Sequence, residues 1–167
     1  MSNIKLQQEL TQWRFNTDID YCIAVTWHVP NTMRYHQNGY DDIWLSKTLT
    51  CYFNKVDRRL FKAAHRNRTA RLPRFVFLEH TDGVGWHAHG YLAKAPNITT
   101  QATIEALEAI WHKHCKQYKT QAFEHRLFWA EKIDADYYGY ALKQAFSGNQ
   151  IHSGKLDVKN IVTAYKH

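Results

Sequence analysis

Residues 74–93 read RFVFLEHTDGVGWHAHGYLA, and this stretch decides the fold of the chain. The runs 74–80 and 86–93 are rich in β-branched and aromatic residues, which predicts two strands. The residues between them, TDGVG, contain two glycines and favour the tight turn of a β-hairpin. One side of the hairpin is apolar and is expected to face the core. It carries Val76, Leu78, Ala88, Gly90 and Leu92, with His80 and Trp86 near the turn.

The other side of the hairpin carries polar residues that could bind a ligand. His87 and His89 lie two apart on one strand, so their imidazoles project from the same face. If the turn is centred on Gly83, Glu79 stands directly opposite His87 and shares that face. A slip of one residue would bring His80 to this face instead. The expected register therefore gathers two imidazoles and a carboxylate, which are ligands for a metal ion.

Three aromatic residues, Phe75, Phe77 and Tyr91, are expected on the same face as the histidines. On an open sheet they could stack unpaired bases, as in RRM-like domains. They could equally pack beneath a neighbouring element. The sequence leaves both interpretations open.

The remaining elements flank this hairpin. The expected elements are a strand at 21–28, an amphipathic helix at 41–66, a second helix at 102–118, a strand at 123–131, and a short third helix at 135–146 capped by Asp134. The order β-α-β-β-α-β-α predicts an α+β fold with an antiparallel sheet. Its helices would lie mainly on one face, in a ferredoxin-like or RRM-like arrangement that leaves the other face free.

Length and composition fit one soluble domain. The chain has 167 residues, of which 44% are hydrophobic, so we expect a single domain over 1–167, with 147–167 a tail of uncertain structure. We expect no helicase domain. A net charge of +7, with many basic residues between Lys55 and Arg74, suggests a polyanionic partner such as nucleic acid. The lack of a signal peptide or apolar span predicts a cytoplasmic protein with no membrane partner.

The metal hypothesis depends on context, because His-x-His pairs are common in a chain with 11 histidines. His112 and His114 form a second such pair, but residues two apart on a helix point about 200° away from each other. We expect that pair to be solvated helix surface. A carboxylate with two imidazoles suits Mg²⁺ or Mn²⁺ with open positions for substrate oxygens.

The third expected helix holds three tyrosines that its geometry separates. At 100° per residue, Tyr138 falls on the apolar arc, Tyr137 at the boundary, and Tyr140 on the polar arc with Lys143 one turn away. A phenol assisted by a metal ion or a cation can attack a phosphodiester. The phosphotyrosyl product can be attacked in turn by a free 3′-OH, so one site could cut and rejoin a strand.

Three segments in this order resemble the HUH single-strand endonucleases, and in particular the rolling-circle replication initiators (Rep branch). AVTW (24–27) is similar to the family's first motif, Glu79 with HAH (87–89) is similar to its metal motif, and YALK (140–143) is similar to its Tyr-x-x-Lys motif. The relaxase branch, with three histidines and a tyrosine near the N-terminus, fits less well. Together the segments span most of the chain.

The resemblance implies a five-stranded or similar antiparallel sheet and nicking of single-stranded DNA through a 5′-phosphotyrosyl intermediate. Glu79, His87 and His89 would bind Mg²⁺ or Mn²⁺, Tyr140 would be the nucleophile, and Lys143 the supporting cation. The substrate would be an origin or hairpin of a plasmid or virus, unwound by a separate helicase. The host compartment would be the cytoplasm of a bacterium or of a virus-infected cell.

Several alternatives stay open at this point. The chain could be an HUH-type transposase, or a non-catalytic RRM-like protein that binds single-stranded nucleic acid through Phe77 and Tyr91. Tyr137 could be a second active tyrosine. His28, His80 and His125 could line the site. The recognition sequence and the oligomeric state are not encoded in any pattern we recognise.

Overall fold

The structure is a computed structural model, and it describes residues 19–29, 41–66, 70–81, 85–116, 127–133, 152–163 and 165. Its elements are β1 (Tyr21–His28), α3 (Asp42–Arg66), β2 (Arg74–Thr81), β3 (Gly85–Ala93), α4 (Thr100–Lys116), β4 (Phe128–Lys132), β5 (His152–Leu156) and the 3-10 turn η2 (Val158–Asn160). The expected third helix at 135–146 and residues 123–126 of the expected strand lie outside the described residues.

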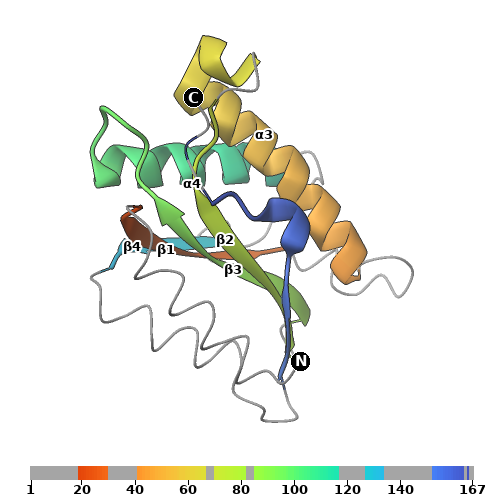
Figure 1. The fold of residues 1–167 in the computed structure, drawn as a ribbon. Helices are drawn as coiled ribbons and strands as arrows, with labels where there is room; N and C mark the ends of the chain where they lie inside the picture. Colours follow the sequence, from red (N-terminus) through yellow and green to blue (C-terminus); the bar gives the residue numbers. More distant parts are fainter. Residues whose placement is uncertain are drawn as a thin grey trace.

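The described strands form one sheet in the order β4-β1-β3-β2-β5, and every neighbouring pair is antiparallel. The first four strands with α3 and α4 follow the ferredoxin-like order of elements, which confirms the α+β class. Both helices lie on the same side of the sheet (Figure 1). None of the described helices is long and apolar enough to cross a membrane.

The hairpin has the expected register. Glu79 pairs with His87, and His80 pairs with Trp86, so the slip of one residue that would exchange Glu79 for His80 does not occur. Leu78 and Ala88 are paired on the core side and are almost completely buried. The apolar alternation of the two strands therefore fixes which side chains leave the core.

The core lies between the sheet and the two helices and is organised around Trp27. This indole is fully buried and makes edge contacts with Tyr52, Phe53 and Phe128. Gly90 gives the ring its space, because a Cβ at that position would lie 2.6 Å from two carbons of the Trp27 ring. A side chain at position 90 would displace the centre of the core.

The sequence analysis expected the opposite face of the sheet to be free, and this expectation is wrong. It carries a second buried cluster, made of Tyr21, Ala24, Phe75, Phe77, Tyr91 and Ile133. Phe77 and Tyr91 are 2% and 4% exposed, so they are packing residues and have no free ring face for a base. Of the two interpretations left open for these aromatics, the structure supports packing.

The helix α3 is less regular than the expected single helix. Lys62 has φ 47° and ψ −112°, which interrupts the helix near its C-terminal end. Before this kink, α3 holds the fully buried Asp57, which accepts hydrogen bonds from the Leu72 backbone N–H and from the Arg74 guanidinium at 3.1 Å. Arg74 also lies over the ring of Phe53. Part of the basic stretch read as a nucleic-acid surface is therefore internal.

Residues 152–163, which the sequence analysis treated as part of a tail, belong to the fold. Strand β5 pairs with β2, and Asp157 then enters the interior beside α3. Asp157 accepts hydrogen bonds from Ser46 at 2.8 Å and from Asn160 at 2.6 Å, while Thr50 bonds to the Asn160 amide oxygen. The satisfied polar network fixes this segment against the helix.

The second His-x-His pair lies on α4, as expected, but it is not solvated surface. His114 is buried, stacks on Trp111, and accepts a hydrogen bond from the Lys55 ammonium at 2.8 Å. Burial and the Lys55 charge lower the pKa of His114 to about 4. His112 is half-buried and lies 3.8 Å from Glu108. The expectation of a solvated pair is wrong for His114, because the buried face of α4 extends to His114 and Cys115.

Candidate metal centre

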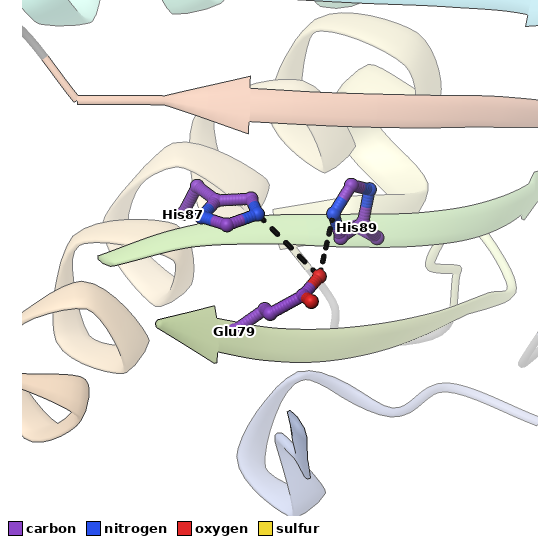
Figure 2. A group of neighbouring side chains, drawn as sticks. All are labelled: Glu79, His87 and His89. Atoms are coloured by element: carbon purple, nitrogen blue, oxygen red, sulfur yellow. Dashed lines mark ion pairs between the residues drawn. The ribbon is translucent and has the colours of Figure 1, made fainter. Parts of the chain in front are cut away.

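Three side chains from the hairpin converge on the sheet face opposite the helices. Glu79 comes from β2, and His87 and His89 come from β3 (Figure 2). One oxygen of Glu79 lies 3.4 Å from Nε2 of His87 and 3.0 Å from Nε2 of His89. One ligand atom from each of the three residues lies within 4.8 Å of the others. The spacing and the donor types can hold a metal ion.

Hydrogen bonds on the far side of each imidazole orient the two rings. Nδ1 of His87 lies 3.0 Å from the carbonyl oxygen of Gly85, and because a carbonyl only accepts, Nδ1 must carry the proton. Nδ1 of His89 lies 3.0 Å from the hydroxyl of Thr26 on β1. Both arrangements leave Nε2 directed at Glu79. This is the pattern of metal-binding histidines, whose second nitrogen is held by a neighbouring group.

The electrostatics of the cluster keep Glu79 ionised. The contacts of its carboxyl with Nε2 of His87 and then of His89 hold the pKa of Glu79 well below its usual range, although burial opposes this. A deprotonated carboxylate is the form that binds a cation. The side chains of His87, Glu79 and His89 are 8%, 15% and 37% exposed, so the cluster opens toward solvent at His89. A bound ion could there take further ligands from a substrate.

His28 extends the row of histidines on this face. It pairs with His87 across β1 and β3, and the two rings stack with centroids 5.5 Å apart. His28 is thus a neighbour of the metal cluster, as the sequence analysis allowed. His80 instead makes an edge contact with Trp86. His125 lies outside the described residues.

The other predicted site residues cannot be placed. Tyr140, Lys143 and the alternative nucleophile Tyr137 lie outside the described residues. Their proximity to the metal cluster stays a prediction from the sequence.

Two residues of this face were not singled out as site residues by sequence reasoning. Thr26 holds His89, and Trp129 on β4 pairs with Thr26 from the other side. Both are found only once the order of the strands is known, since β4, β1 and β3 are far apart in the sequence. For Thr26 the sequence did contain a signal: it lies between two core residues of β1, so its side chain must point to the opposite face.

The basic surface and the metal cluster lie on opposite sides of the sheet. Arg58, Arg59 and Lys62 are exposed on α3, which covers the helical side. The cluster of Glu79 and the two histidines is on the other side. Positive charge on α3 can therefore attract a polyanion at a distance but does not line the metal centre.

No family model matches the chain, and no curated protein matches it. Among solved structures, the chain is similar to the N-terminal nuclease domain of non-structural protein 1 of minute virus of mice, with a TM-score of 0.35 and 11% identity. The match covers 95% of this chain and 77% of that one.

The structure of that viral domain is described as having Zn²⁺ coordinated in its active-site pocket and as recognising DNA at the origin of replication.

Proposed function

We propose that this protein is a metal-dependent endonuclease that nicks and rejoins single-stranded DNA at the start of rolling-circle-type replication. The observation that carries the proposal is the convergence of Glu79, His87 and His89, with both imidazoles presenting Nε2 to one point. The order of the sequence motifs, which resembles the HUH endonucleases, supports the same function. In this proposal residues 1–167 act as one catalytic domain, in the cytoplasm of a bacterial host or infected cell.

The three ligands suit a divalent ion. Glu79, His87 and His89 would bind Mg²⁺ or Mn²⁺, and the bound ion would polarise a phosphodiester and neutralise charge on its oxygens. Two imidazoles favour Mn²⁺ over Mg²⁺, because Mg²⁺ prefers oxygen ligands throughout. The partial exposure of His89 leaves room for a phosphate oxygen beside the ion.

The proposed nucleophile is the phenol of Tyr140, with the ammonium of Lys143 as the supporting cation. Attack of the Tyr140 oxygen on phosphorus breaks the bond to the 3′ oxygen of the preceding nucleotide. The downstream strand stays on the protein as a 5′-phosphotyrosyl ester, and the upstream strand leaves with a free 3′-OH. Attack by a 3′-OH reverses the reaction and rejoins the strand.

The covalent product is the direct test. The protein is incubated with Mn²⁺ and single-stranded DNA oligonucleotides labelled at the 3′ end, from a pool that includes hairpins, and then separated on a denaturing gel. We expect a labelled protein band that disappears in Tyr140→Phe and is retained in the matched control Tyr137→Phe. Loss of the band only in Tyr137→Phe would move the nucleophile, and the absence of any adduct or cut strand would refute the endonuclease.

The metal ligands have a separate test that does not require activity. Mn²⁺ binding is measured by isothermal titration calorimetry for the unsubstituted protein and for Glu79→Gln, His87→Ala and His89→Ala. We expect each substitution to weaken binding at least tenfold, and the control His112→Ala, in the helical pair, to leave it unchanged. Equal Mn²⁺ affinity of all variants would show that the hairpin does not hold the ion.

A further inference from the structure

The sheet face that carries Glu79, His87 and His89 also carries an exposed tryptophan. Trp129 on β4 is 45% exposed, and among the large hydrophobic side chains in the described parts of the chain, only Ile43 and Ile98 are also exposed. Ile98 lies just before α4, and Ile43 is in the first turn of α3. Trp129 is therefore the one exposed aromatic among these three, and the only one of them on a strand.

The register of three strands places Trp129 in line with the metal ligands. Thr26 pairs with Trp129 on one side and with His89 on the other. Directly paired residues share a face, and the Thr26 hydroxyl contacts His89 itself. Since neighbouring strands lie about 4.8 Å apart, the backbone at Trp129 is roughly 10 Å from that at His89.

The neighbours of Trp129 along β4 show that its exposure is not a fraying of the strand. Phe128 is buried in the main core, and Ala130 packs against the same cluster. The strand is thus anchored on the helical side while the indole projects from the other side. The indole therefore presents an exposed aromatic face from a strand that is fixed to the core.

We infer that Trp129 is a stacking site for an unpaired nucleobase next to the metal centre. The chemistry of this face favours that occupant: a cation site takes the phosphate, and a flat aromatic ring takes the base of a nearby nucleotide. A divalent ion held by Glu79 and the two histidines would bring positive charge to this face, which favours a polyanionic strand over an uncharged apolar partner. The site differs from the stacking platform expected at Phe77 and Tyr91, because those rings are buried.

The inference rests on the proposed function, in that it takes a single DNA strand as the ligand. It goes beyond that function because it assigns to Trp129, a residue outside the three motifs, a contact with a DNA base of any identity. Glu131 lies two residues further on the same face of β4. Its carboxylate would repel a phosphate, so the strand should run from Trp129 toward the histidines.

The test compares a strand that has bases with one that has none. Binding of a fluorescent oligo(dT) of roughly a dozen nucleotides and of a fully abasic strand of equal length is measured with Mn²⁺ present, in a Tyr140→Phe background that prevents cleavage by the proposed nucleophile. We expect Trp129→Leu to weaken oligo(dT) binding roughly 5- to 150-fold while the abasic strand binds as before. Trp129→Phe should retain most of the affinity, and the control Ile98→Ala should change neither.

Three other outcomes of these experiments overturn the inference. Equal weakening for both strands would show that Trp129 does not contact a base, and no weakening would show that it contacts no strand. If light scattering finds that Trp129→Leu converts a dimer to a monomer, the indole belongs to an interface between copies. The adduct assay decides the nicking reaction separately: a protein that binds oligo(dT) through Trp129 but forms no adduct refutes the endonuclease alone, and one that binds no strand refutes both.

Discussion

The hydrogen bond between Thr26 and His89 should determine metal affinity. For Nε2 of His89 to bind an ion, Nδ1 must carry the proton and donate it to the Thr26 hydroxyl, 3.0 Å away. Thr26→Val removes this acceptor while it keeps the shape and the β-branching of the side chain. The ring would then lose the contact that fixes its rotation and tautomer.

The magnitude follows from the exposure of the ring. Loss of a hydrogen-bond partner behind a metal ligand costs about 10- to 100-fold in affinity. The side chain of His89 is 37% exposed, so water can replace part of the lost bond and the lower value applies. We therefore expect Thr26→Val to weaken Mn²⁺ binding about tenfold, or about 1.4 kcal/mol. His87, held by a backbone carbonyl, should be unaffected.

The assay is calorimetric titration of Mn²⁺ into the unsubstituted protein, Thr26→Val and Thr26→Ser. The serine variant keeps the hydroxyl and should bind Mn²⁺ nearly as well as the unsubstituted protein. Urea unfolding checks that the valine variant is folded. The reasoning is refuted if Thr26→Val binds Mn²⁺ within twofold of the unsubstituted protein while His89→Ala abolishes binding, because the hydrogen bond would then have no part in ligand orientation.

Three further predictions concern the fold and are checked by urea unfolding. Gly90→Ala should lower the free energy of unfolding by about 1–3 kcal/mol, because its Cβ meets the Trp27 ring. The double variant Gly90→Ala/Trp27→Phe should lose less stability than the sum of the two single variants, whereas strict additivity would mean that the contact is unimportant. Asp57→Ala should lower the free energy of unfolding by about 3–5 kcal/mol, because it leaves the Arg74 guanidinium buried and unpaired. Adding Arg74→Leu should restore part of that stability. A smaller loss in Asp57→Ala would contradict this reasoning. The pKa of His114 is about 4 in the fold against 6.5 as its ordinary value, so the unfolded chain takes up the proton first. Stability should therefore fall by on the order of 2 kcal/mol as the pH drops from 6.5 to 4, and His114→Gln should flatten the profile in this window.

The hairpin was predictable because local rules act on it. Its alternation and turn fix the register within twenty residues of sequence, and the apolar face leaves only one pairing that buries Leu78 and Ala88. The cluster of Glu79 with the two histidines follows from that register alone. The α+β class followed from the order of the elements, which is also information along the chain.

What the sequence did not reveal depends on contacts between distant segments. The burial of Phe77 and Tyr91 cannot be read from β2 and β3, because alternation tells which residues share a face but not whether that face is covered. The strand β5 was missed because HSGKL contains a glycine and two charged or polar neighbours, which reads as a loop. Its place is set by β2 and by Asp157, more than 70 residues from β2 in sequence.

The position of β5 also defines how far the protein can be shortened. A chain that ends at Phe146 would keep each residue of the proposed chemistry, yet it would lose the strand that pairs with β2 opposite Glu79. The N–H and C=O groups of β2 would then form an open edge, which can pair with the same edge of another molecule. Such a fragment should self-associate in size-exclusion chromatography. The smallest independent unit of this protein is therefore determined by the strand that covers β2 and not by the last motif that carries chemistry.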